Sequence, residues 1–171
     1  MANFNHIPDL VLENARIFRK NFEGRATDFN AEGNRNFCVF IDPQDVEALS
    51  QAGWRIRQLP PREGIEGSEP AYFMDVRVKY DSKRPPQVYL VTSKNTVLLD
   101  EKTVGTIDHA EIQNVDLMLH PSYWEAAGKS GIKAYLKSMY VTIVDDVLAE
   151  KYGTGFYASP IYEDDSPFQE G

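Results

Sequence analysis

The sequence has little of what metal or thiol chemistry requires. Its one cysteine, Cys38, cannot form a disulfide within the chain. The three histidines, His6, His109 and His120, show none of the close spacings that zinc sites use. We therefore predict no metal site, and we expect Cys38, which lies in the apolar run 36–41, to be a small buried residue rather than a reactive thiol.

Long apolar runs and nucleotide-binding loops are also missing. No run approaches the ~18–20 apolar residues of a membrane-spanning helix, and no signal peptide is visible, so we expect a protein of the cytoplasm with no membrane partner. The segment Gly128-Lys129-Ser130 lacks the upstream glycine of a phosphate-binding loop.

Catalytic patterns are equally scarce. No Gly-x-Ser-x-Gly nucleophile pattern occurs. Acidic residues could in principle hold the two metals of a nuclease, but their spacing has no pattern, which favours solvated surface acid. These are Asp75, Asp81, Asp100, Glu101, Asp108 and Asp116. We predict no enzymatic activity and no cofactor.

Acidic charge is concentrated near the C-terminus. Residues 1–140 carry 17 Lys and Arg against 19 Asp and Glu, whereas residues 141–171 carry one Lys against seven acids. A sequence pI near 4.9 ordinarily argues against nucleic acid. That argument weakens here, because a near-neutral body can still carry one basic face. Length and composition predict one domain over residues 1–150 and a flexible acidic tail over residues 151–171.

The body has the pattern of a mostly β protein. Short apolar or alternating runs separated by turn residues predict strands over 10–18, 36–41, 54–59, 72–80, 87–93, 96–99, 115–120 and 131–143. Asp42 and Pro43 are typical of a helix start and Gly53 of its end, and a second short helix or turn is expected over 106–111. This pattern predicts a closed or partly closed β-barrel or a β-sandwich. An oligonucleotide-binding-type (OB-type) β-barrel with added strands and one or two short helices fits the length, and a β-sandwich fits the pattern nearly as well.

One predicted strand pair carries cations beside an aromatic ring. In the strand 72–80, Phe73, Arg77 and Lys79 alternate with an apolar face formed by Met74, Val76 and Val78. The following turn adds Lys83 and Arg84, and we expect 72–80 and 87–93 to pair as a basic hairpin. A solvated sheet face explains the same alternation about as well.

A second strand repeats this combination. Lys133, Tyr135 and Lys137 share one face of the strand 131–143. Tyr123-Trp124 could form a stacking platform in a loop, although core or rim packing is the commoner role of such residues. A further basic cluster, Arg16, Arg19 and Lys20, lies near the first strand. Cations along a groove with rings between them are what single-stranded DNA (ssDNA) binding requires, and a barrel would place these strands side by side.

The last residues form an acidic segment that leads to a proline and an aromatic residue: Glu163, Asp164, Asp165, Ser166, Pro167 and Phe168. This segment resembles the acidic tail of bacterial and phage ssDNA-binding proteins. The resemblance implies a hook that binds partner enzymes, with Glu163, Asp164, Asp165, Pro167 and Phe168 as the contacts. Three residues follow Phe168 here, whereas the familiar tail ends on the phenylalanine. An ordinary solvated acidic end is the alternative.

The body resembles the ssDNA-binding proteins of tailed bacteriophages. The stretches that carry the resemblance are 12–17, 33–41, 53–54, 85–93, 112–117 and 131–137, so it covers a whole domain. It implies an OB-type barrel, sequence-independent binding of ssDNA, and work beside phage proteins of DNA replication, recombination and repair in the host cytoplasm. The sequence leaves the oligomeric state open, and a homo-oligomer is among the alternatives. The alternative is a non-catalytic β-domain that binds protein, such as a virion component or an inhibitor.

Overall fold

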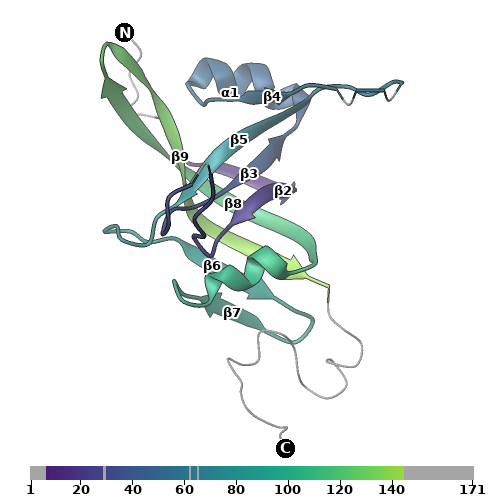
Figure 1. Ribbon diagram of the computed structural model, residues 1–171, viewed down its shortest axis with the longest axis vertical. Coiled ribbons are helices and arrows are strands. Elements are labelled where there is room, and N and C mark those ends of the chain that lie inside the picture. The colour runs from purple at the N-terminus through teal and green to yellow at the C-terminus, as the bar shows by residue number, and fades with distance from the viewer. Residues whose placement is uncertain (1–6, 29, 62, 65, 145–171) are drawn as a thin grey trace, which may run out of the picture.

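The computed structural model describes residues 7–28, 30–61, 63–64 and 66–144. Its main sheet follows the strand order β1-β8-β9-β5-β3-β2 (Figure 1). These strands are β1 (Leu10–Ala15), β2 (Ile17–Asn21), β3 (Arg35–Ile41), β5 (Ala71–Val78), β8 (Ile112–Ala126) and β9 (Lys129–Ile143). Only Arg16 separates β1 from β2, so the two end strands of the sheet are halves of one bent segment. The order of pairing is open, but the shared segment brings its two ends together, so the sheet curls into a partly closed barrel of the OB type.

Three further strands extend the barrel. β4 (Arg57–Leu59) pairs with β5, whereas β6 (Gln87–Val91) lies between β7 (Thr96–Leu99) and β9. The predicted hairpin between 72–80 and 87–93 is wrong, because in the described chain β5 and β6 each pair in parallel with β9 instead of with each other. They follow the same edge of β9 in succession. The alternation of side chains identified both strands, but it carries no information about their partner.

Strand β8 is longer than the sequence suggested. Pro121, expected to end it, lies within the strand opposite Ala134 of β9. The pairing of β1 with β8 stops at Leu119, so Pro121 lies where the other edge of β8 has no neighbour among the described strands. Proline is tolerated at such an edge because no N–H is needed there.

The short helices lie where the sequence placed them. Asp42 accepts a hydrogen bond from the Gln44 N–H, Pro43 opens the 3₁₀ turn η2 (Pro43–Asp45), and α1 (Val46–Ala52) follows. Gly53 ends α1 with a φ of 111°, a conformation that suits glycine. A second 3₁₀ helix, η3 (Val104–His109), buries two apolar side chains against the end of the barrel.

The core fills the barrel with the inward residues of each strand. Val39, Met74, Val76, Leu119 and Val141 are almost wholly buried. In β9 the inward residues change from even to odd numbers at a register irregularity opposite Met118 and Leu119. Among the described residues, no helix combines the length and apolarity needed to cross a membrane.

Candidate nucleic-acid interface

The cationic and aromatic residues predicted on β5 and β9 lie on one continuous surface. Arg77 of β5 is the parallel neighbour of Tyr135 of β9, and Tyr135 is the antiparallel neighbour of His120 of β8. Arg77 also lies opposite Asn36 of β3. Cross-strand neighbours project to the same side of a sheet, so the solvent-facing sides of β3, β5, β8 and β9 join there. We call this surface the outer face.

The β8–β9 hairpin extends the outer face beyond the barrel. It projects from one end of the molecule, and its turn at Ala127 and Gly128 has φ values of 52° and 79° (Figure 1). Trp124 lies opposite Gly131 and on the same side as Lys133. A Cβ on Gly131 would lie 3.0 Å from the Trp124 Nε1 atom, so the indole packs directly against the glycine.

Trp124 therefore lies in a strand, whereas the sequence had suggested that it lies in a loop. Its neighbour Tyr123 lies opposite Ile132, on the other side of the hairpin. The two aromatic residues cannot form a single platform.

Lysines on the outer face differ in their environment. Lys133 is exposed near the base of the hairpin. Lys137 donates to Asp9 Oδ2 at 2.6 Å, and Asp9 Oδ1 lies 2.8 Å from His120 Nδ1. Burial raises the pKa of Asp9, but hydrogen bonds from Lys137 and His120 outweigh it and hold that pKa below its usual value. Asp9 thus remains ionised and offsets part of the positive charge.

The remaining predicted cations lie just after β5. Lys79 is exposed two residues beyond Arg77, and Lys83 and Arg84 are exposed in the loop 79–86. This loop leads from β5 to β6 along β9. The sequence had predicted Lys83 and Arg84 in the turn of a hairpin, but these cations instead border the outer face.

Phe73 projects toward the outer face, as predicted, but it is not an exposed ring. Its relative exposure is 1%. The rings of Phe18 and Phe40 pack beside it: Phe18 stacks on Phe40 at 4.3 Å between centroids and meets Phe73 edge-on at 5.3 Å. Phe18 and Phe40 are partly exposed. The sequence did not single out this ring cluster, because its members come from three strands that are separate along the chain.

Arginines cover the ring cluster. The Arg16 guanidinium lies 4.8 Å from the Phe40 centroid. Arg19 lies 5.4 Å from Phe18 and 5.5 Å from Phe73, and Arg57 lies 5.1 Å from Phe73. The basic cluster near the first strand was visible in the sequence, but the rings beneath it were not. Guanidinium groups over phenyl rings make this part of the outer face both cationic and aromatic.

Cys38 lies beneath the same arginines and is buried, as predicted. Its thiol donates to Asp75 Oδ1 at 3.3 Å, while Arg57 pairs with Asp75 Oδ2 at 2.7 Å. Burial, followed by the negative charge of Asp75, raises the pKa of the Cys38 thiol to about 12. The thiol is therefore protonated and unreactive at neutral pH.

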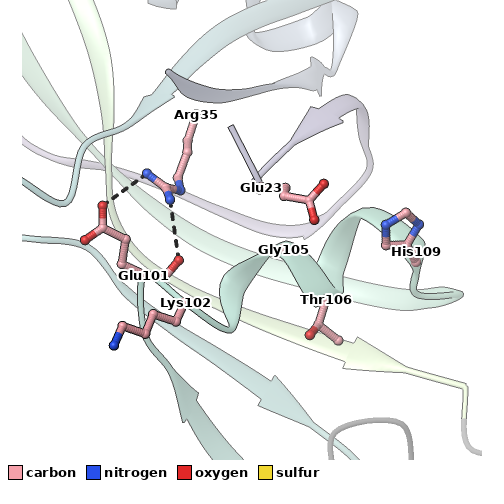
Figure 2. Close-up of a pocket in the computed structure, with 7 residues that line it drawn as sticks. All are labelled: Glu23, Arg35, Glu101, Lys102, Gly105, Thr106 and His109. Carbon is pink, nitrogen blue, oxygen red and sulfur yellow. Dashed lines mark hydrogen bonds and ion pairs between the residues drawn. The ribbon is translucent and has the colours of Figure 1, made fainter. Parts of the chain in front are cut away.

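A hollow of about 720 Å³ lies elsewhere, between η3 and the start of β3 (Figure 2). Arg35 enters it from the core-facing side of β3 and pairs with Glu101 at 3.3 Å. The other lining residues are Glu23, Lys102, Gly105, Thr106 and His109. Its two carboxylates balance the charges of Arg35 and Lys102. The hollow therefore attracts a polyanion such as DNA much less strongly than the outer face does.

A family model described as "Putative phage ssDNA-binding domain" matches residues 1–165. The chain belongs to this family. No curated protein matches the sequence. The resemblance stated from the sequence is thus confirmed for the body, whereas the tail residues Glu163 to Phe168 lie outside the described part of the chain.

Solved structures support the fold. The ssDNA-binding protein of bacteriophage Enc34, as a C-terminal truncation, matches with a TM-score of 0.50 and 12% identity, covering 81% of this chain and 87% of that chain. The structure of the Enc34 protein in complex with ssDNA matches with a TM-score of 0.51 and 12% identity, covering 81% and 88%. At this identity the match establishes a shared architecture, that of a phage ssDNA-binding protein.

Proposed function

We propose that the chain binds ssDNA on the outer face without sequence preference. The observation that carries this proposal is the pairing of Arg77 with Tyr135, which joins the cationic and aromatic sides of β5 and β9 into one surface. Family membership supports the same ligand. The chemistry needed is binding alone, so we propose no enzymatic activity.

The DNA backbone would follow the cations while bases contact the rings. Lys133, Arg77 and Lys137 line one half of the path, and Arg16, Arg19 and Arg57 line the other. Tyr135, Trp124 and the partly exposed rings of Phe18 and Phe40 supply surfaces on which any base can stack. Such stacking contributes roughly 1–3 kcal/mol per base and accepts every base, since each has a π-face.

Access to the ring cluster requires the arginines to move. A guanidinium that leaves a phenyl ring for a phosphate exchanges a cation–π contact for a charge-assisted hydrogen bond. The vacated ring is then open to a base. Lys79, Lys83 and Arg84 would guide the strand electrostatically from the neighbouring loop.

The test is fluorescence anisotropy of a labelled strand of about 30 nucleotides at low and moderate salt, with the matching duplex as a control. We expect tight, salt-sensitive binding to the single strand and weak binding to the duplex. Equal affinity for both would indicate a general DNA-binding protein. Binding to neither would favour the protein-binding alternative.

Paired variants locate the site. Lys133→Ala/Tyr135→Ala should reduce affinity by at least about tenfold, since it removes one phosphate contact and one stacking ring. Lys102→Ala/Tyr123→Ala removes the same two residue types away from the outer face and should leave affinity unchanged. An unchanged affinity in the first variant would remove β9 from the site.

A second pair tests the ring cluster. Phe40→Leu keeps an apolar side chain but removes a stacking surface, and it should weaken binding about fivefold or more. Phe22→Leu alters a ring that is wholly buried in the core and serves as the matched control. Melting temperatures of both variants separate lost binding from lost folding.

The acidic tail is proposed to recruit proteins of replication, recombination or repair in the host cytoplasm. Its acidic residues Glu163, Asp164 and Asp165 and the Pro167-Phe168 pair suit a basic, apolar groove on a partner. Phe168→Ala should retain ssDNA affinity but lose stimulation of strand-displacement synthesis by the replication enzymes with which the chain works. Stimulation that survives this variant would contradict the tail proposal.

A further inference from the structure

Next to the outer face, beyond Lys137, a region on the same side of β9 lacks charge altogether. It consists of the outward side chains of β6, β7 and the end of β9, which are Gln87, Tyr89, Val91, Thr96, Leu98, Ser138, Tyr140 and Thr142, with Val144 directly after. These described positions contain no Asp, Glu, Lys or Arg, although such residues make up 26% of the chain. We call this surface the uncharged face.

The uncharged face combines exposed apolar side chains with neutral polar ones. Leu98 is 56% exposed, Tyr140 45% and Val144 47%. Tyr89 and Tyr140 stack at 4.5 Å between centroids, and Leu98 continues their row on β7. The exposed row of Leu98, Tyr89 and Tyr140 is suited to contact with another molecule.

Nucleic acid is a poor occupant of this surface. The face itself holds no cation, the adjoining Lys137 is paired with Asp9, and the next residue in the row beyond Tyr140 is Asp116 of β8. A protein surface is therefore the better match.

The adjoining edge strand can itself pair with another strand. Within the described chain, β7 pairs only with β6, so its other edge has no strand neighbour among the described residues. Its sequence Thr96-Val97-Leu98-Leu99 contains no proline or charge, the features that usually prevent pairing at an edge.

We propose that β7 pairs antiparallel with the β7 of a second copy of this chain about a two-fold axis beside Val97, so that the uncharged faces of the two copies join side by side. This register sets Thr96 opposite the Leu98 of the second copy. It also places Lys94, just before β7, opposite Asp100, just after β7, of the second copy. The two-fold axis repeats this contact, so two pairs of opposite charges meet. A register centred on Leu98 would instead oppose Lys94 and Lys102, which have like charges.

The chain's own C-terminal segment is the less suitable occupant. Residues 145–171 carry seven acids and one lysine. Asp116 and Asp100 border the uncharged face, and they would repel an acidic segment. A second copy brings a complementary edge and a matching apolar row.

The proposed pairing leaves the outer face accessible. β7 lies at the end of the molecule away from the β8–β9 hairpin (Figure 1). Two paired copies could therefore bind one strand of DNA together, and this consequence alone rests on the proposed function. Self-association is measured without DNA, so its failure and a failure of DNA binding are distinguishable.

The first test is sedimentation velocity of the full chain without DNA, at protein concentrations from about 1 to 300 µM, the range expected for a small interface. We expect a concentration-dependent dimer. Leu98→Lys should raise the dimer dissociation constant at least about tenfold, because it places a charge in the apolar row. Val11→Lys makes the same change at an equally exposed position on β1 and should not alter the dimer. A wild-type monomer throughout, or a dimer that Leu98→Lys leaves intact, overturns the proposal.

The second test measures the register. Thr96→Cys and Leu98→Cys chains are mixed and oxidised in the presence of the protonated, buried Cys38. The register centred on Val97 predicts mixed crosslinked dimers in excess of either crosslinked homodimer. Predominance of the Leu98→Cys homodimer overturns this register, and absence of any crosslink overturns the pairing.

Discussion

Asp9 holds two basic side chains of the outer face at once. Its carboxylate contacts both Lys137 and His120, so the Lys137 ammonium is only partly available to a phosphate. The alternation of Lys133, Tyr135 and Lys137 identified the correct side of β9 from sequence. It could not reveal that Asp9, which is 128 residues from Lys137, would neutralise one of these lysines.

Asp9→Asn should therefore raise ssDNA affinity. Removal of the negative charge frees Lys137, and we expect a gain of about two- to fivefold, in line with an exposed ion pair. Anisotropy at low salt measures this gain, and Asp28→Asn on the exposed turn is the control. A lower affinity would show that Asp9 positions Lys137 for DNA.

The same variant has a defined pH dependence. Because the pKa of Asp9 is lowered in the folded protein, its ionised form stabilises the fold above the unfolded pKa of about 3.9. This contribution is lost as the pH falls through the folded pKa. Asp9→Asn should lower the melting temperature slightly at pH 7 and converge with the wild type near pH 2. A constant difference across this range would contradict the assignment.

Phe73 marks the limit of residue-level prediction. Its side of β5 follows directly from the alternation of the strand. The burial of Phe73 could not be predicted in this way, because Arg19 of β2 and Arg57 of β4 cover its ring. Nothing in the sequence indicates that these strands lie near β5.

Among the elements, the strands were predictable but their partners were not. The apolar alternation located β5, β6, β7 and β9 to within a few residues, and the Asp42-Pro43 and Gly53 signals located α1. Pairing depends on contacts between distant segments, so the expected β5–β6 hairpin gave way to two parallel pairings with β9. Site residues that lie on a single strand were predictable from its alternation. The ring cluster was not, because its members come from several strands that are distant in sequence.

The β8–β9 hairpin owes its aromatic surface to a glycine. Gly131→Ala would force the Trp124 indole off its neighbour, since the added Cβ would lie 3.0 Å from Nε1. We expect a shift of tryptophan emission and a loss of ssDNA affinity of about fivefold. Ser130→Ala, in the same hairpin, should change neither. Unaltered affinity in Gly131→Ala would exclude Trp124 from the DNA path.

η3 is tied to the end of β2 by one carboxylate. Asp108 accepts the Phe22 N–H at 2.8 Å and the Glu23 N–H at 3.0 Å. Asp108→Ala leaves both donors without this partner and should lower the free energy of unfolding by about 1–3 kcal/mol. Urea denaturation measures this loss, with an unchanged m-value as the sign of an intact native state. Asp108→Asn, which keeps one acceptor, should lose less, and an equal loss would contradict this role.

For the whole molecule, the distribution of charge matters more than its total. The chain carries a net charge of −8, yet the outer face gathers Arg16, Arg19, Arg57, Arg77, Lys133 and Lys137 against Asp9, Asp75 and Asp116. Composition alone would have excluded nucleic acid, and only the separation of the C-terminal acid kept that function open.

This distribution predicts a salt dependence that the pI would not suggest. If the cations contact about four to six phosphates, the logarithm of affinity should fall with the logarithm of salt concentration with a slope near −3 to −4. Arg16→Ala/Arg19→Ala should reduce the magnitude of that slope by about one. Arg25→Ala/Lys102→Ala removes equal charge beside the hollow and should lower affinity far less. Equal slopes for the wild type and the arginine variant would remove these arginines from the path.

The central position of β9 has a consequence for how the chain acquires its structure. β9 lies between β8 on one edge and β5 and β6 on the other, yet it is the last described strand to leave the ribosome. Before β9 is synthesised, β5 and β6 each lack one of their neighbouring strands. The apolar sides of several strands then cannot be buried in a closed core. Such long-range pairing slows folding. β9 should therefore have to be synthesised before the barrel resists proteases, and nascent chains arrested before residue 129 should remain susceptible to them.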